Sequence, residues 1–206
     1  MSTVGTHIVL ASGWLLWCFL HSFLIAPGWM RVMRRALGSR IAYYRLSYVL
    51  FSAVTLMPVL LLQYRIDSPL LWSPPVYLRV LQWIGVAVAL LIFWLAARQY
   101  DQPFFLGLRQ IREHREGSDS EFSGFASTGI LHRMRHPYYS AGILLLLCWG
   151  DATPASMILK AIGIGYFLIG AVLEERKLVA EFGSDYQRYQ HDVPMFIPKF
   201  RWREGD

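Results

Sequence analysis

Long apolar runs constrain the fold of this sequence more than any other feature. Three of them cover about residues 7–26, 44–64 and 76–97, each near the ~20 residues that an α-helix needs to cross the hydrocarbon core of a membrane. Two more follow at 138–150 and 154–173. Because a backbone inside lipid must satisfy its own hydrogen bonds, we expect an all-α polytopic membrane protein with about five transmembrane helices.

The run at 138–150 is short, since about thirteen helical residues extend roughly 20 Å and do not cross a bilayer alone. We therefore expect the last two runs to form a helical hairpin, followed by a cytosolic segment. No linker rich in Pro, Gly or Ser divides the chain. The sequence predicts one membrane domain over 1–206, with three helices in 1–98, a cytosolic or interfacial loop in 99–134, and the hairpin and tail in 135–206.

The charges support a membrane protein and argue against nucleic acid binding. Only 17% of the residues are charged, against about 25% in soluble domains. Most of the positive charge follows the first, third and last apolar runs, which is the positive-inside pattern. The net charge of +6 therefore favours a membrane surface, with the N-terminus outside and the C-terminus in the cytosol.

The stretch RHPYY, residues 135–139, opens the short apolar run. Pro137 suits the first turn of a helix, whose free N–H groups favour an anion. Arg135 can bind a carboxylate with two hydrogen bonds, and aromatic rings can lie against a flat base or a sulfonium cation. The alternative is a basic membrane anchor with interfacial tyrosines.

A pair of carboxylates, Glu174 and Glu175, follows the last apolar run. Adjacent carboxylates at the end of a membrane helix cost free energy unless water surrounds them or they bind a ligand. A solvated helix end is therefore the alternative interpretation. In a hairpin this pair lies beside residues 135–139, with Tyr186 and Tyr189 folding back over it. Only one of the two glutamates can point directly into such a pocket. These groups together suit S-adenosylmethionine.

The combined motifs resemble the integral-membrane isoprenylcysteine carboxyl methyltransferase superfamily. They comprise RHPYY, the EERKL of 174–178, Phe182-Gly183, Tyr186, Tyr189, Val193-Pro194 and Ile197-Pro198. The resemblance covers about residues 130 to 200 and implies a cytosolic pocket for S-adenosylmethionine that is reached from the membrane. No metal site is expected. The candidate cofactor-binding residues are Arg135, His136, Pro137, Tyr139, Glu174, Glu175, Leu178, Tyr186 and Tyr189.

Shorter stretches resemble bacterial methanethiol S-methyltransferase and its denitrification-associated membrane relatives. They are His21-Ser22, residues 43–52 and residues 104–110. This resemblance implies an enzyme in a bacterial inner membrane, surrounded by membrane lipid. It also implies a small or lipid-like methyl acceptor, and the acceptor it favours is a thiol such as methanethiol. The alternatives are carboxyl methylation of isoprenylcysteine-like or other lipid acceptors, an NADPH-dependent membrane reductase, and a non-enzymatic membrane scaffold.

Two residues are candidates for catalysis. Glu175 is expected to orient the cofactor or the acceptor. His21 is an ionisable side chain near one end of the first apolar run, and a neutral imidazole can accept a thiol proton. The alternative for His21 is a packing role, with a hydrogen bond to Ser22 or to another helix.

Overall fold

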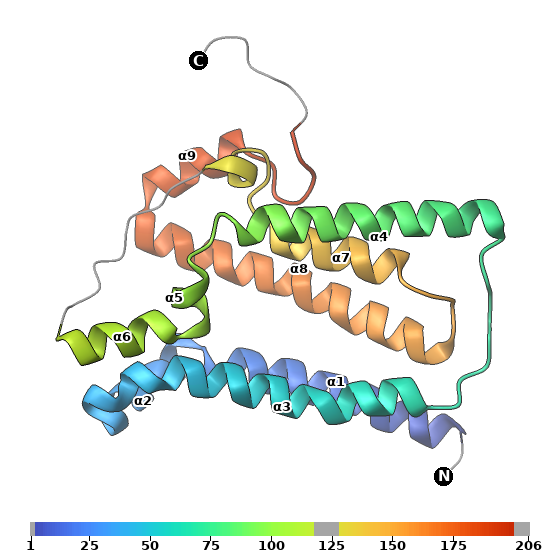
Figure 1. Ribbon diagram of the computed structural model, residues 1–206, viewed down its shortest axis with the longest axis horizontal. Helices are drawn as coiled ribbons and strands as arrows, with labels where there is room; N and C mark the ends of the chain where they lie inside the picture. Colours follow the sequence, from blue (N-terminus) through green and yellow to red (C-terminus); the bar gives the residue numbers. More distant parts are fainter. Residues whose placement is uncertain (1–2, 118–127, 200–206) are drawn as a thin grey trace. The chain divides into compact units, whose positions relative to one another are not determined.

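The computed structural model describes residues 3–117 and 128–199, and these residues form helices joined by turns and by an extended connection at 66–75, as Figure 1 shows. The single pairing of β type among them is an isolated bridge between Trp72 and Ala152. This part of the chain confirms the prediction of an all-α fold. Its helices are α1 (Thr3–Leu24), α2 (Pro27–Leu37), η1 (Gly38–Tyr43), α3 (Tyr44–Arg65), α4 (Val76–Ala97), α5 (Gln102–Leu106), α6 (Leu108–Glu116), η2 (Gly129–His132), α7 (Pro137–Cys148), α8 (Pro154–Phe182) and α9 (Ser184–Asp192).

Four helical stretches in the described residues are long and apolar enough to cross a membrane. They are Thr3–Leu24, Pro27–Arg65, Val76–Ala97 and Pro154–Phe182, and α7 is a shorter apolar helix. The third span agrees with the predicted one at both ends. The last is longer than the predicted 154–173, because no Gly or Pro interrupts the residues after Leu173 until Gly183, whose φ of 56° ends the helix.

The segment predicted as a loop, 99–134, contains α5, α6 and η2. Asp101 caps α5 by accepting a hydrogen bond from the Phe104 N–H at 3.0 Å. Gly107 then turns the chain into α6 with a φ of 88°. Residues 118–127 of this predicted loop lie outside the described residues.

The contacts group the described chain into two compact units, and the prediction of one domain stays a prediction. The first unit holds α1, α2, η1, α3, α5, α6 and residues 154–162 of α8. Leu10, Trp14 and Ala155 form its buried apolar cluster. The indole of Trp14 donates a hydrogen bond to Gln63 Oε1 at 3.0 Å, so a polar contact joins α1 to α3 inside the apolar region.

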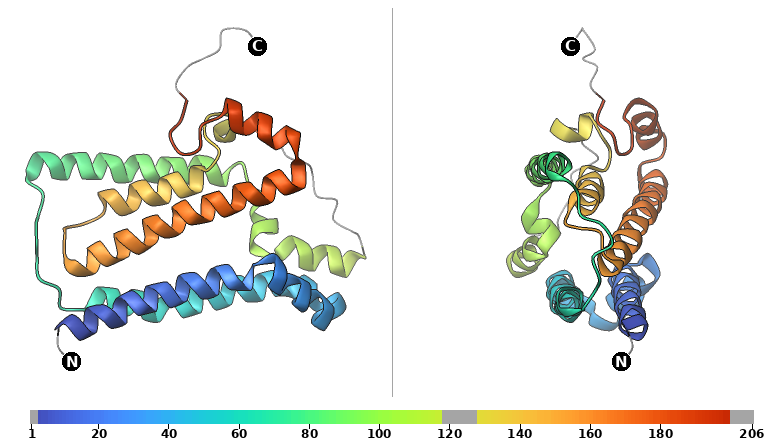
Figure 2. Two further views of the ribbon diagram at one scale, coloured as in Figure 1. Left: turned by 180° about the vertical axis from the view of Figure 1, so that it is seen from behind. Right: turned by 90° about the vertical axis from the view of Figure 1, so that its right-hand side faces the viewer.

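The second unit holds α4, η2, α7, residues 163–182 of α8, and α9. Helix α7 lies beside α4 and beside residues 163–182 of α8 in the views of Figures 1 and 2.

Glycines set the spacing between α7 and α8. A Cβ added at Gly142 would lie 2.6 Å from the Phe167 ring, and one at Gly163 would lie 2.7 Å from Leu146. Because residues 139, 142 and 146 lie opposite 170, 167 and 163, the two segments run antiparallel. Close approach at small residues is a common way to pack membrane helices.

Candidate functional site

The candidate site surrounds the N-terminus of α7. His136 is the residue before the helix and Pro137 occupies its first position, as expected for proline. Both are buried, with His136 only 4% exposed. The Ser140 hydroxyl lies within donating distance of the His136 and Phe196 carbonyls, at 2.9 and 2.8 Å, and links the first turn of α7 to the chain near its C-terminal end.

A backbone pairing brings residues 193–199, here the C-terminal segment, against residues 133–136. The N–H groups of Arg135 and His136 donate to the carbonyls of Pro194 and Met195 at 3.0 and 3.1 Å. The N–H of Lys199 donates in return to the Arg133 carbonyl at 3.0 Å. The residues before α7 are therefore covered by a segment about 60 positions later in the chain.

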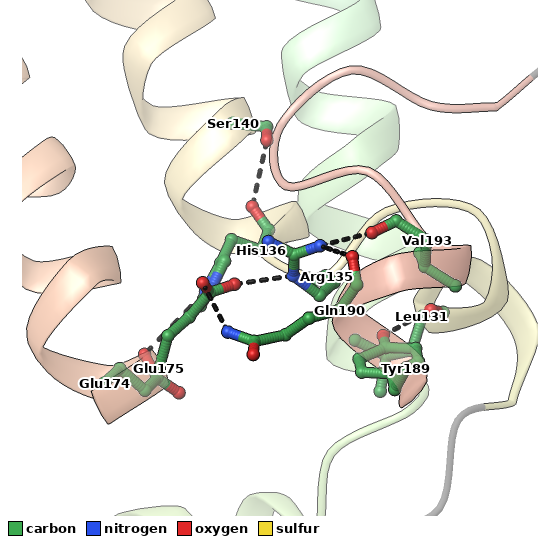
Figure 3. A network of polar contacts seen from close by, with 9 residues as sticks. All are labelled: Leu131, Arg135, His136, Ser140, Glu174, Glu175, Tyr189, Gln190 and Val193. Atoms are coloured by element: carbon green, nitrogen blue, oxygen red, sulfur yellow. Dashed lines mark hydrogen bonds and ion pairs between the residues drawn. The ribbon is translucent and has the colours of Figure 1, made fainter. Parts of the chain in front are cut away.

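Arg135 lies at the centre of a polar network, which Figure 3 shows from close by. Its Nε donates to Glu175 Oε1 at 2.5 Å, and its Nη1 donates to the carbonyls of Gln190 and Val193. The side chains of Arg135 and Glu175 are only 10% and 13% exposed. The guanidinium thus binds oxygens of the chain itself, and its predicted contact with a ligand carboxylate stays a prediction.

Glu175 is the more enclosed of the two glutamates. One oxygen accepts from Arg135 and lies 3.1 Å from His136 Nε2, and the other accepts from the Gln190 side-chain amide at 2.9 Å. The Glu174 side chain is 43% exposed and lies 4.0 Å from His136 Nδ1. The imidazole therefore has a carboxylate near each of its nitrogens, and the accessible carboxylate is that of Glu174.

Tyr139 adds an aromatic surface to the site. Its ring is stacked on His136, with centroids 5.4 Å apart and planes at 27°, and it contacts Phe167 at 5.9 Å. Phe196 lies on the same imidazole at 6.1 Å. An imidazole, two aromatic rings and a partly exposed carboxylate are therefore together at the start of α7.

Tyr186 and Tyr189 are buried in an apolar cluster. They pack against Leu178, Val179 and Phe182 with exposed fractions of 1% and 9%. The Tyr189 hydroxyl donates to the Leu131 carbonyl at 2.5 Å, and burial raises the pKa of Tyr189 to about 12. In this structure both rings hold α9 in place, and their predicted contact with a ligand stays a prediction.

The sequence analysis missed Gln190 and the carbonyl of Val193. Both complete the shell of Arg135 and Glu175. For the Gln190 side chain a signal existed, because it follows Tyr186 and Tyr189 at the spacing of one helix face, whereas the Val193 carbonyl has no such signal. The family motifs in this region include Tyr186, Tyr189 and Val193-Pro194 but not Gln190.

His21 belongs to a separate cluster in the first unit. Its Nδ1 lies 3.2 Å from Ser52 Oγ, and the Tyr48 hydroxyl lies within 3.0 Å of the imidazole nitrogens. Trp17 is stacked on the imidazole at 4.8 Å and donates to the Ser52 carbonyl. Tyr48 and Ser52 lie on α3, so these contacts match the packing alternative, in which His21 bonds to another helix, and the catalytic role stays a prediction.

These features define an all-helical protein with several helices able to cross a membrane and a buried polar network at the start of a short apolar helix. The family model described as NnrU protein matches residues 9–177. The chain belongs to the NnrU protein family.

Curated relatives are similar over most of this chain. Methanethiol S-methyltransferase of Pseudomonas sp. (strain GM41(2012)) is 28% identical over 86% of this chain and 66% of its own length. Methanethiol S-methyltransferase 2 of Bradyrhizobium diazoefficiens is 29% identical over 89% of this chain and 70% of its own length. Methanethiol S-methyltransferase of Mycobacterium tuberculosis is 30% identical over 86% of this chain and 72% of its own length. The chain thus spans about two thirds of these relatives, which confirm the resemblance seen in the sequence. No solved structure matches the chain.

Proposed function

We propose that this protein is a membrane methyltransferase that uses S-adenosylmethionine and transfers its methyl group to a small thiol such as methanethiol. The observation that carries this proposal is the similarity to proteins named methanethiol S-methyltransferase over 86% and 89% of the chain. The grouping of Arg135, His136 and the glutamate pair at one end of α7 and α8 supports it independently.

The residues at the start of α7 fit S-adenosylmethionine. Glu174 offers an accessible carboxylate for an ammonium group or for ribose hydroxyls, and the rings of Tyr139 and Phe196 suit adenine or a sulfonium cation. When bound, the cofactor would supply an electrophilic methyl group to a thiol sulfur, with S-adenosylhomocysteine and the thiol proton as the other products. Our proposal assigns ligand contact to Glu174, Tyr139 and His136.

Arg135, Glu175 and Gln190 act on the ligand indirectly in this proposal. Their mutual hydrogen bonds hold α8, α9 and the C-terminal segment around His136. A rigid binding site favours methyl transfer, because alignment of donor and acceptor lowers the barrier by up to ~7–11 kcal/mol in favourable cases. His21 remains our proposed proton acceptor for the thiol, since a thiol with a pKa near about 8.5 needs help to ionise.

We further propose that α7 and α8 form a transmembrane hairpin in a bacterial inner membrane, with the N-terminus outside and the C-terminus in the cytosol. The basic residues after α1 and α4 and near the C-terminus support this orientation. Membrane lipid then surrounds the apolar helices, and the acceptor reaches the site from the membrane or the cytosol.

Incubation of the purified protein with methyl-labelled S-adenosylmethionine and a panel of acceptors tests the activity. The panel contains methanethiol, larger thiols, prenylcysteine analogues and phospholipid amines. We expect volatile label, as dimethyl sulfide, from methanethiol. Label in a prenylcysteine ester would instead support carboxyl methylation. Thermal stabilisation by NADPH but not by S-adenosylhomocysteine would contradict the proposal and favour a reductase.

The two glutamates give a sharper test of the site. We expect Glu174→Gln to weaken S-adenosylhomocysteine binding about tenfold with little change in thermal stability, because its carboxylate is accessible. Glu175→Gln is expected to lower the melting temperature, because it removes the negative charge that Arg135, His136 and Gln190 contact. Calorimetric titration and thermal unfolding in detergent measure both. Unchanged ligand affinity in Glu174→Gln would refute its assignment.

A further inference from the structure

Helix α2 separates its charged and apolar residues onto opposite faces. Arg31, Arg34 and Arg35 have the i, i+3, i+4 spacing of one helix face, and all three are exposed. The opposite face is apolar and is formed by Trp29, Val32, Met33 and Ala36. A short helix with this division is typical of one that lies in the plane of a membrane surface.

Contacts within the first unit fix α2 against the end of α1 and the start of α3. The Trp29 indole donates to the Tyr44 hydroxyl at 2.8 Å, and this hydroxyl donates to the Leu24 carbonyl at 2.8 Å. Trp29 also contacts the ring of Phe23 at 5.0 Å. The helix therefore begins where the apolar span of α1 ends, which is the depth of the lipid headgroups in a membrane-spanning protein.

The charge of this region has no acidic counterpart nearby in the sequence. Residues 1–66 contain no Asp or Glu, whereas five arginines occur between positions 31 and 45. Helix α6 contrasts with it, since Glu113 and Glu116 alternate with its arginines and Arg109 forms ion pairs with Asp101 and Glu113. The arginines of α2 thus form a group of positive charges on a helix that contains no acidic residue.

We propose that α2 binds the phosphodiester headgroups of anionic phospholipids such as phosphatidylglycerol. The apolar face inserts among the acyl chains beside α1, and the three arginines contact the phosphates. Guanidinium groups suit this task because they bind phosphate oxygens with two parallel hydrogen bonds. The inference does not depend on the proposed methyl transfer.

The test measures lipid binding to the full chain in a neutral detergent by native mass spectrometry. We expect the protein to bind phosphatidylglycerol more tightly than phosphatidylcholine. Arg31→Gln with Arg34→Gln is expected to weaken phosphatidylglycerol binding about tenfold, since each cation near an anionic surface contributes measurably. The charge-preserving pair Arg31→Lys with Arg34→Lys is expected to keep part of the preference, because lysine keeps the charge but not the two parallel hydrogen bonds.

The matched control is Arg112→Gln with Arg115→Gln, a pair of exposed arginines with the same i, i+3 spacing on α6. We expect this control to change phosphatidylglycerol binding less than twofold. Equal losses in the two glutamine pairs, or equal affinity of the unmodified protein for both lipids, would overturn the proposal. Displacement of the lipid by an equal concentration of inorganic phosphate would also overturn it, because the site would then bind free anions. Melting temperatures verify that each variant is folded.

Discussion

At the scale of single residues, the ion pair of Arg135 and Glu175 organises the candidate site. Both side chains are nearly buried, and each has further partners in His136, Gln190 and the carbonyl of Val193. Removal of one member of a buried pair leaves an uncompensated charge, which costs more than the pair contributes. We therefore expect Arg135 to contribute strongly to the stability of the protein.

We expect Arg135→Gln to destabilise the protein by about 3 kcal/mol, because Glu175 would stay enclosed without its cation. Thermal unfolding in detergent measures the effect, and the double variant with Glu175→Gln should recover part of it. Arg188→Gln is the control, since Arg188 pairs with Asp185 at the surface, where both side chains are more than two thirds exposed. A loss no larger than in this control would show that the pair is not a structural one.

The raised pKa of Tyr189 predicts that the stability of the protein decreases at alkaline pH. Burial raises its pKa to about 12, above the value of about 10 for a free tyrosine, so the folded state favours the neutral phenol. This contribution is complete below pH 10 and is lost as the pH rises toward 12. Relative to Tyr189→Phe, the unmodified protein should lose about 1 kcal/mol between pH 9 and about pH 11. Parallel stability curves for the two proteins would contradict this.

At the scale of helices, glycine sets the contact between α7 and α8. Gly142 faces the Phe167 ring, and Gly163 faces Leu146. These contacts fix the rotation of α8 about its axis relative to α7. That rotation decides that Glu175 faces Arg135 while Glu174 stays accessible.

Gly142→Ala should destabilise the protein by about 1–3 kcal/mol, because the added Cβ would lie 2.6 Å from the Phe167 ring. Gly165→Ala is the matched control on α8, where an added Cβ meets nothing within 4 Å. Thermal unfolding compares the two. We expect Phe167→Leu to restore part of the stability lost in Gly142→Ala, and failure of this rescue would place the effect elsewhere.

At the scale of the whole molecule, the proposed orientation in the membrane is the next property to test. After replacement of Cys18 and Cys148 by serine, single cysteines are introduced at the exposed positions Asp67 and Asp185. We expect a membrane-impermeant maleimide to label Asp67→Cys in intact spheroplasts and Asp185→Cys only after permeabilisation. Labelling of Asp185→Cys in intact spheroplasts would contradict a cytosolic C-terminal segment, and total labelling after permeabilisation is the control.

The sequence alone determined the long apolar helices and which motifs lie next to one another. Apolar runs predict helices because helical hydrogen bonds are local, and the span at Val76–Ala97 was predicted at both ends. The sequence also placed RHPYY beside the glutamate pair, since an antiparallel connection brings the start of one helix to the end of the next. It did not predict that α8 continues to Phe182, because the charged residues after Leu173 are also compatible with a helix end.

Only the tertiary structure decided how the members of the site divide their roles. Glu174 and Glu175 are neighbours in the sequence, and their difference in exposure depends on the rotation of α8. Likewise, Arg135 is enclosed by the carbonyls of Gln190 and Val193, which lie more than fifty positions away along the chain. No local pattern encodes such contacts, because they exist only once the chain has folded back on itself.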